Sequence, residues 1–95
     1  MDIYSGQGSI RIANELFSVT ASISVDAANG SWEGAFNYPP RFFASKGDVA
    51  FLQITVGSKR ISGPVRITWL HTSPPGAGFV EFVGTKPARI EEVKT

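Results

Sequence analysis

The side chains that most often carry enzyme chemistry are sparse in this sequence. Cysteine is absent and His71 is the single histidine, so neither a thiolate nucleophile nor a zinc site built on Cys and His can be assembled. We expect His71 to be an exposed loop histidine. No Gly-x-Ser-x-Gly motif is present, and the carboxylates are scattered singly or adjacent near the C-terminus. The sequence therefore predicts a protein that is not an enzyme and has no metal site or cofactor.

Two further patterns bear on ligand binding. Gly6-Gln7-Gly8 lacks the third glycine and the strand-to-helix context of a dinucleotide fingerprint, so we interpret it as a glycine pair at a strand entry. Lys59, Arg60 and Arg66 near Trp69 could hold a phosphate backbone and stack a base, as barrels that bind single strands do. However, we expect Trp69 in the core, and a net charge of +1 gives no long-range field to attract nucleic acid.

The length and composition define the framework that must position any binding residue. Ninety-five residues, of which 42% are hydrophobic, suffice for one core and one domain. We find no secretory signal and no apolar run long enough for a membrane helix. Together with the absence of cysteine, this predicts a soluble, cytoplasmic protein without membrane insertion.

The alternation of polar and apolar residues, together with an apolar run over residues 49–56, predicts six short strands. They cover residues 9–12, 17–25, 32–36, 49–56, 61–70 and 79–84. Asn29-Gly30 fits a two-residue type I′ turn between the second and third strands, and residues 57–60 form a polar turn between the fourth and fifth. We expect Pro64 at an edge or a bulge, because proline cannot donate to a sheet ladder.

Short strands without a long helix predict an all-β fold. The expected architecture is a single six-stranded antiparallel barrel over residues 1–84, with a small β-sandwich as the alternative. Such a barrel is filled by its own side chains, Trp32 among them, which leaves the outer surface and the loops for binding. We also expect one helical turn over residues 41–46, closed by Gly47, and a tail or short C-terminal helix over residues 85–95.

The stretch from Asn29 to Phe36, Asn-Gly-Ser-Trp-Glu-Gly-Ala-Phe, resembles the Asp/Asn-x-Ser-x-x-Gly signature of PilZ domains, which are small six-stranded β-barrels of bacteria. Residues 46–52, 62–69 and 78–82 follow in the order of that family's later strands. In the family, the signature and an upstream Arg-x-x-x-Arg bind cyclic di-GMP through bidentate, charge-assisted bonds to arginine. The resemblance therefore implies a ligand site made of Gln7, Arg11, Asn29, Ser31 and Gly34.

The chain departs from that pattern at Gln7, where the family has its first arginine. A neutral amide cannot replace a guanidinium on an anion, which counts against cyclic di-GMP. We therefore expect a non-catalytic binding or adaptor module that acts on a protein partner. Two alternatives stay open: a structural domain that forms homo-oligomers through a sheet edge, and a single-strand nucleic-acid barrel, which the near-neutral charge disfavours.

Overall fold

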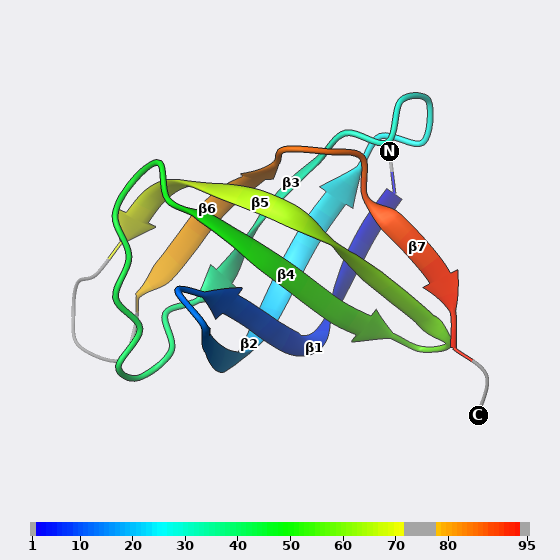
Figure 1. Cartoon of the computed structure of the whole chain (residues 1–95). Coiled ribbons are helices and arrows are strands. Elements are labelled where there is room, and N and C mark those ends of the chain that lie inside the picture. The colour runs from blue at the N-terminus through cyan, green and yellow to red at the C-terminus, as the bar shows by residue number, and fades with distance from the viewer. Residues whose placement is uncertain (1, 72–77, 94–95) are drawn as a thin grey trace.

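The computed structural model describes residues 2–71 and 78–93, which form seven strands (Figure 1). The strands are β1 (Asp2–Ile12), β2 (Glu15–Val25), β3 (Trp32–Asn37), β4 (Val49–Val56), β5 (Lys59–His71), β6 (Phe79–Gly84) and β7 (Arg89–Glu92). Within these residues, no helix is long and apolar enough to cross a membrane.

Six of the strands close into an antiparallel barrel. Hydrogen-bonded neighbours follow the order β4, β1, β2, β3, β6, β5, and the pairing of β4 with β5 completes the ring. β7 pairs with β5 alone and stands outside the ring (Figure 1). The predicted six-stranded all-β barrel is thus confirmed, and closure of the ring excludes the sandwich alternative.

Two-residue turns join β1 to β2 and β4 to β5, and the second of these lies within the polar turn predicted at residues 57–60. Ala13 and Asn14 join β1 to β2, and their φ values of 50° and 68° match a type I′ turn. The type I′ turn predicted at Asn29-Gly30 is wrong, because only Gly30 has a positive φ, of 76°. The Asn29 side chain instead accepts a hydrogen bond from the N–H of Ser31 (2.9 Å), which holds a longer loop between β2 and β3.

Two other local predictions are also wrong. Residues 41–46 form no helical turn; Phe42 N–H donates to Pro39 O (3.2 Å) and Arg41 has a φ of 64°, as in a type II turn. The tail contains a strand, β7, where a C-terminal helix was an option. Its backbone bonds to the edge of β5 that β6 leaves free, which satisfies its polar groups without a helix.

Pro64 lies within β5, which has a neighbour on each side. Its carbonyl accepts the N–H of Thr85 (3.0 Å), so its ring nitrogen faces the same side of the strand. On that side of β5, β7 pairs with residues 59–62 and β6 pairs with residues 65–71. Pro64 therefore lies in the gap between these two neighbouring strands. The absent N–H therefore costs no ladder bond, although the strand is not an edge strand.

Aromatic side chains lie at both ends of the barrel and are joined through the core by Phe36 and Phe82, which pack among buried aliphatic residues. Phe42, which is buried, packs edge-to-face against Phe17, Phe36 and Tyr38, with ring centroids 5.2, 5.7 and 5.5 Å away. Trp32 closes the opposite end, in agreement with its predicted burial. The interior is filled by side chains, which leaves the outer surface for binding.

Candidate binding face

The structure separates the residues that the resemblance implied as one site. Arg11 pairs with Leu16 at the start of β2, whereas Asn29 and Ser31 lie in the loop beyond Val25, at its end. At about 3.3 Å per residue, roughly 30 Å of strand separates the two positions. Arg11 and the loop therefore cannot grip one small ligand together.

The two remaining residues of that set do not bridge the gap. Gln7 pairs with Thr20, midway along β2. Gly34 faces the interior, where an added Cβ would overlap the carbonyl oxygen of Ser22 on β2. The close approach of β2 and β3 therefore accounts for the glycine without a ligand.

A similar contact explains the glycine pair of β1. An added Cβ at Gly6 or Gly8 would overlap the carbonyl oxygen of Thr55 or Gln53 on β4. The pair allows β1 and β4 to approach closely and close the barrel, which gives it a structural role, although it lies in the middle of β1 and not at the predicted strand entry.

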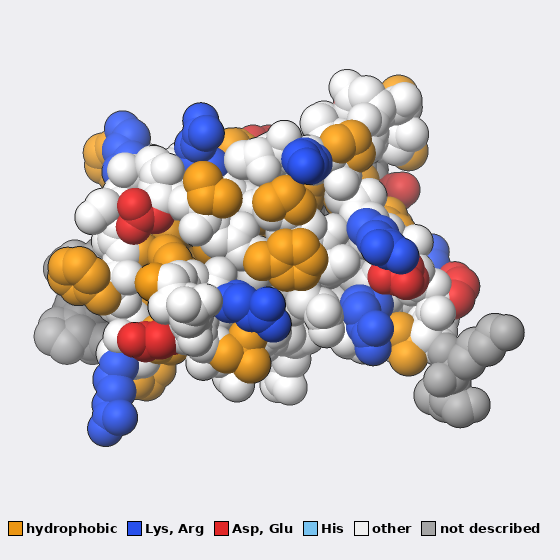
Figure 2. Space-filling view, viewed as in Figure 1, with side chains coloured by type: hydrophobic (Ala, Val, Ile, Leu, Met, Phe, Trp, Pro, Cys, Tyr) orange, Lys and Arg blue, Asp and Glu red, His pale blue; other side chains and the backbone are white. Residues whose placement is uncertain are grey.

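A different group of outward side chains lies over β1, β4 and β5 and the start of β2. We call it the arginine face, and it consists of Arg11, Leu16, Val49, Phe51, Pro64 and Arg66. Figure 2 shows hydrophobic and basic side chains interspersed over the middle of the side that carries these strands, with acidic side chains nearer its left and right ends. Leu16, Val49 and Phe51 remain exposed although the core is filled, which is the usual mark of an interaction surface, and Pro64 beside them is partly buried.

Arg11 lies between two exposed apolar side chains. It pairs with Leu16 of β2 on one side and with Phe51 of β4 on the other. Leu16 is 65% exposed and Phe51 44% exposed. With Ser9 and Gln53, these residues line an open hollow of about 150 Å³. The hollow offers apolar walls and a guanidinium to one side chain of a partner.

Arg66 has a similar position on β5, between one exposed and one partly buried valine. It pairs with Val49 of β4, which is 56% exposed, and on its other side with Val83 of β6. Neither Arg11 nor Arg66 forms an ion pair with any carboxylate in the described part of the chain. Both guanidinium groups are therefore available to an anionic group of a partner.

The outward charges are sorted by strand. Outward positions of β1, β4 and β5 carry Arg11, Arg60 and Arg66, and no carboxylate. Outward positions of β3 and β6 carry Glu33 and Glu81, and no Lys or Arg. β4 and β3 lie on opposite sides of the ring. Over these five strands the outward charges are thus divided into a positive and a negative side, while β7 places Glu91 opposite Arg60 at one end of β5.

Trp69 is half-exposed, so its predicted place in the core is wrong. The register of β5 against β6 shifts between Ile67 and Trp69, and this irregularity turns Trp69 outward and Leu70 inward. Lys46 Nζ lies 5.0 Å from the centroid of the indole ring. Lys59 and Arg60 lie at the other end of β5, so they do not form one cluster with Trp69.

His71 is the last residue of β5 and not a loop histidine. Its ring stacks on Phe79 with centroids 4.1 Å apart, and its Nε2 lies 2.7 Å from a carboxylate oxygen of Glu81. These contacts account for the histidine as a cross-strand surface contact between β5 and β6.

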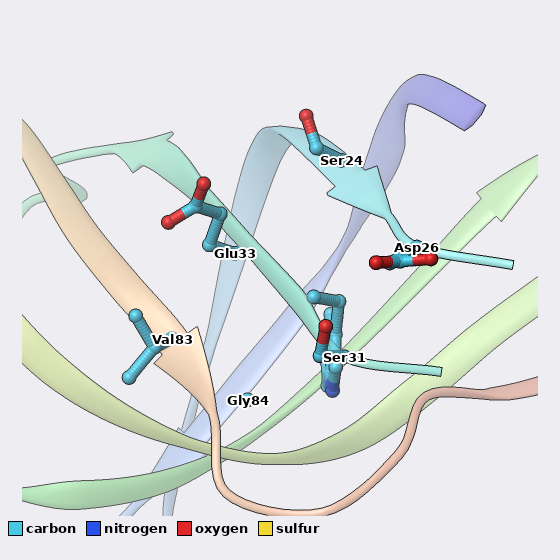
Figure 3. A pocket seen from close by; sticks show the side chains of 7 residues that line it. Ser24, Asp26, Ser31, Glu33, Val83 and Gly84 are labelled. Atoms are coloured by element: carbon cyan, nitrogen blue, oxygen red, sulfur yellow. The ribbon is translucent and has the colours of Figure 1, made fainter. Parts of the chain in front are cut away.

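A polar hollow of about 320 Å³ lies over β2, β3 and β6, as Figure 3 shows. Its lining includes Ser24, Asp26, Ser31 and Glu33. In Figure 3 the carboxylates of Asp26 and Glu33 stand apart and do not point to a common centre. Within the described ranges, no three His, Cys, Asp or Glu side chains are grouped as metal ligands would be.

Val49 and Phe51 lie in the apolar run that predicted the fourth strand, and nothing in the sequence marked them as binding residues. The signal for their outward orientation was present, because Ala50, Leu52 and Ile54 alternate with them and would fill the inward positions of a half-buried strand.

Comparison of the chain with protein-family models, curated proteins and solved structures found no match. The arginine face is therefore the feature from which a function can be argued.

Proposed function

We propose that the protein is a non-catalytic binding or adaptor module that holds a protein partner against the outer surface of its barrel. The observation that supports this is the arginine face, where apolar side chains stay exposed between arginines that lack ion pairs among the described residues. Arginine and aromatic residues are enriched in protein interfaces. Rigid strands hold these groups at fixed spacing, which lowers the entropic cost of binding.

The shape of the surface also favours a macromolecule over a small ligand. The hollow beside Arg11 is open and holds about 150 Å³, less than the roughly 300 Å³ or more of most small-molecule pockets. A protein partner can cover the whole face, whereas a small molecule would remain largely exposed to water.

A cyclic dinucleotide is the less favoured ligand. The first arginine of the PilZ pattern is replaced by Gln7, and Asn29 and Ser31 lie at the other end of β2 from Arg11. Arg11 alone would provide one anion contact, which does not define a nucleotide site.

The proposal can be tested by affinity capture from the source organism, followed by reconstitution with the purified partner. The bait is the wild-type chain or the double variant Phe51→Ser/Arg66→Glu. We expect a partner that binds the wild type and loses at least about tenfold in affinity with the variant, because interface anchors cost more than about 1 kcal/mol when removed. Both positions face outward, so stability should change by less than about 1 kcal/mol.

Lys86→Glu supplies a matched control, because it makes the same charge change on an exposed residue outside the arginine face. It should bind the partner as the wild type does. If every partner binds the double variant as tightly as the wild type, the arginine face is not the binding surface and the proposal fails.

A further inference from the structure

The arginine face has a chemistry that selects one kind of protein segment, and this inference rests on the proposed function. We propose that the face binds an extended, acidic segment of a partner protein with the pattern acidic-x-apolar-x-acidic. The argument uses the spacing of Arg11 and Arg66, the apolar residues between them, and the charge of the surrounding surface.

The two arginines are spaced for residues four apart in an extended chain. Arg11 pairs with Phe51, and Arg66 pairs with Val49, two residues away on the same strand β4. With strands about 4.8 Å apart and residues about 3.3 Å apart, the two Cα atoms are roughly 12 Å from each other. Residues i and i+4 of an extended segment are separated by about 13 Å.

The residue midway between those two carboxylates would meet an apolar surface. In an extended segment, residues i, i+2 and i+4 point to the same side. Val49 and Phe51 lie between the two arginines, and the hollow lined by Leu16 and Phe51 opens beside Arg11. A Leu, Ile or Phe at i+2 would therefore bury its side chain while the flanking carboxylates receive hydrogen bonds from the guanidinium groups.

The same residues fit a nucleic acid less well. Leu16 and Val49 are aliphatic and cannot stack on bases, so Phe51 is the single aromatic platform between the arginines. In addition, β1, β4 and β5 carry few outward cations. Few phosphates would be neutralised, so the release of counterions would contribute little to nucleic-acid binding. Aliphatic side chains between arginines instead match the alternating apolar and acidic groups of a peptide.

The probe for the experiment is the peptide Ser-Glu-Thr-Leu-Thr-Glu-Ser, titrated into the full ¹⁵N-labelled chain. Three control probes replace both Glu by Gln, replace Leu by Ser, or move Leu next to the first Glu. A fourth is a single-stranded oligothymidylate of equal length. We expect amide shifts to cluster at residues 9–11, 49–53 and 65–66, and each control peptide to bind at least about tenfold more weakly, since charged hydrogen bonds contribute about 1.5–3 kcal/mol.

Charge reversal provides the second arm. Arg66→Glu should weaken the acidic probe at least tenfold, while Lys86→Glu should leave its affinity unchanged. The inference is overturned if the Gln-containing probe binds as well as the acidic probe, or if oligothymidylate binds more tightly. It is also overturned if the labelled chain forms concentration-dependent oligomers that Arg66→Glu abolishes, because the negative side of a second copy would then be the occupant.

The outcomes separate this inference from the function on which it rests. If no probe binds, but a captured partner still depends on Phe51 and Arg66, the binding module stands and the acidic pattern is wrong. If no probe binds and no captured partner depends on Phe51 and Arg66, both proposals fail.

Discussion

At the scale of single residues, Trp32 shows how a side chain fixes the sequence around it. Its indole closes one end of the barrel, and its Nε1 donates to the carbonyl of Lys86 (2.8 Å). The ring occupies the space that a Cβ would need at Gly63 and at Gly84. These two glycines are therefore required by packing and not by backbone conformation, since neither has a positive φ.

Gly84→Ala should therefore destabilise the protein by about 2–3 kcal/mol or more, because the new methyl group would overlap the Trp32 indole. Urea unfolding measures the loss of stability. In a Trp32→Phe background the cost of Gly84→Ala should be smaller by at least about 1 kcal/mol, since the smaller ring leaves room. Equal costs in the two backgrounds would show that the indole is not the obstacle.

Arg41 is a second residue whose type conflicts with its conformation. Its φ of 64° costs an L-residue about 1–2 kcal/mol, and glycine removes that cost while losing about 0.5–1 kcal/mol of chain entropy. Arg41→Gly should thus stabilise the fold by up to about 1 kcal/mol, and Arg41→Val should destabilise it. The midpoints of thermal unfolding distinguish the two variants, and a Gly variant that melts below the Val variant would contradict this account.

At the scale of elements, β5 organises the molecule because it pairs with three other strands. It closes the barrel against β4, and along its other side it pairs first with β7 and then with β6. Pro64 lies where the neighbour changes, and the irregularity after Ile67 turns Trp69 to the surface. One strand thus determines which side chains enter the core and which reach the arginine face.

β7 should be the least protected strand, because all four of its residues are exposed and the closed barrel does not need it. Its attachment consists of the ladder to β5, the Val93 N–H bond to Ser58 O (2.6 Å) and the Ser58–Glu92 side-chain bond (3.1 Å). Native-state hydrogen exchange should show the amides of β7 opening locally, well before those that join β4 to β5. Equal protection of both sets would make β7 part of the barrel's cooperative unit.

The elements that the sequence predicted well are those whose pattern follows burial. Alternation located β2 and β3, and the barrel was inferred from short strands without a helix.

The first half of β1 was missed, because inward glycines replace the apolar residues that would mark a strand. β7 was missed because its side chains are all exposed, and Trp69 was assigned to the core because a register shift leaves no mark in the sequence. Arg11 lies beside Phe51 because β1 pairs with β4 when the barrel closes. Local sequence patterns do not encode this long-range pairing, so the arginine face was not predicted.

At the scale of the whole molecule, barrel closure sorts charges that the sequence leaves mixed. Arg11 and Arg66 are far apart in the chain, and they come together because β4 lies between β1 and β5. Glu33 and Glu81 meet in the same way on β3 and β6, on the other side of the ring. An acidic partner would be attracted to one side and repelled by the other, which would orient its approach.

The same closure should govern how the protein folds. Hairpins such as β1–β2 and β4–β5 join neighbouring segments, whereas the ring closes through β1 with β4 and β3 with β6, which pair Ile10 with Leu52 and Phe36 with Val80. Folds dominated by such distant pairings fold in milliseconds to seconds. We expect stopped-flow refolding in that range, and Leu52→Ala, which weakens a closing contact, should slow folding more than Ile3→Ala on the exposed outer face of β1. Refolding in microseconds, or a Leu52→Ala variant that only unfolds faster, would place ring closure after the rate-limiting step.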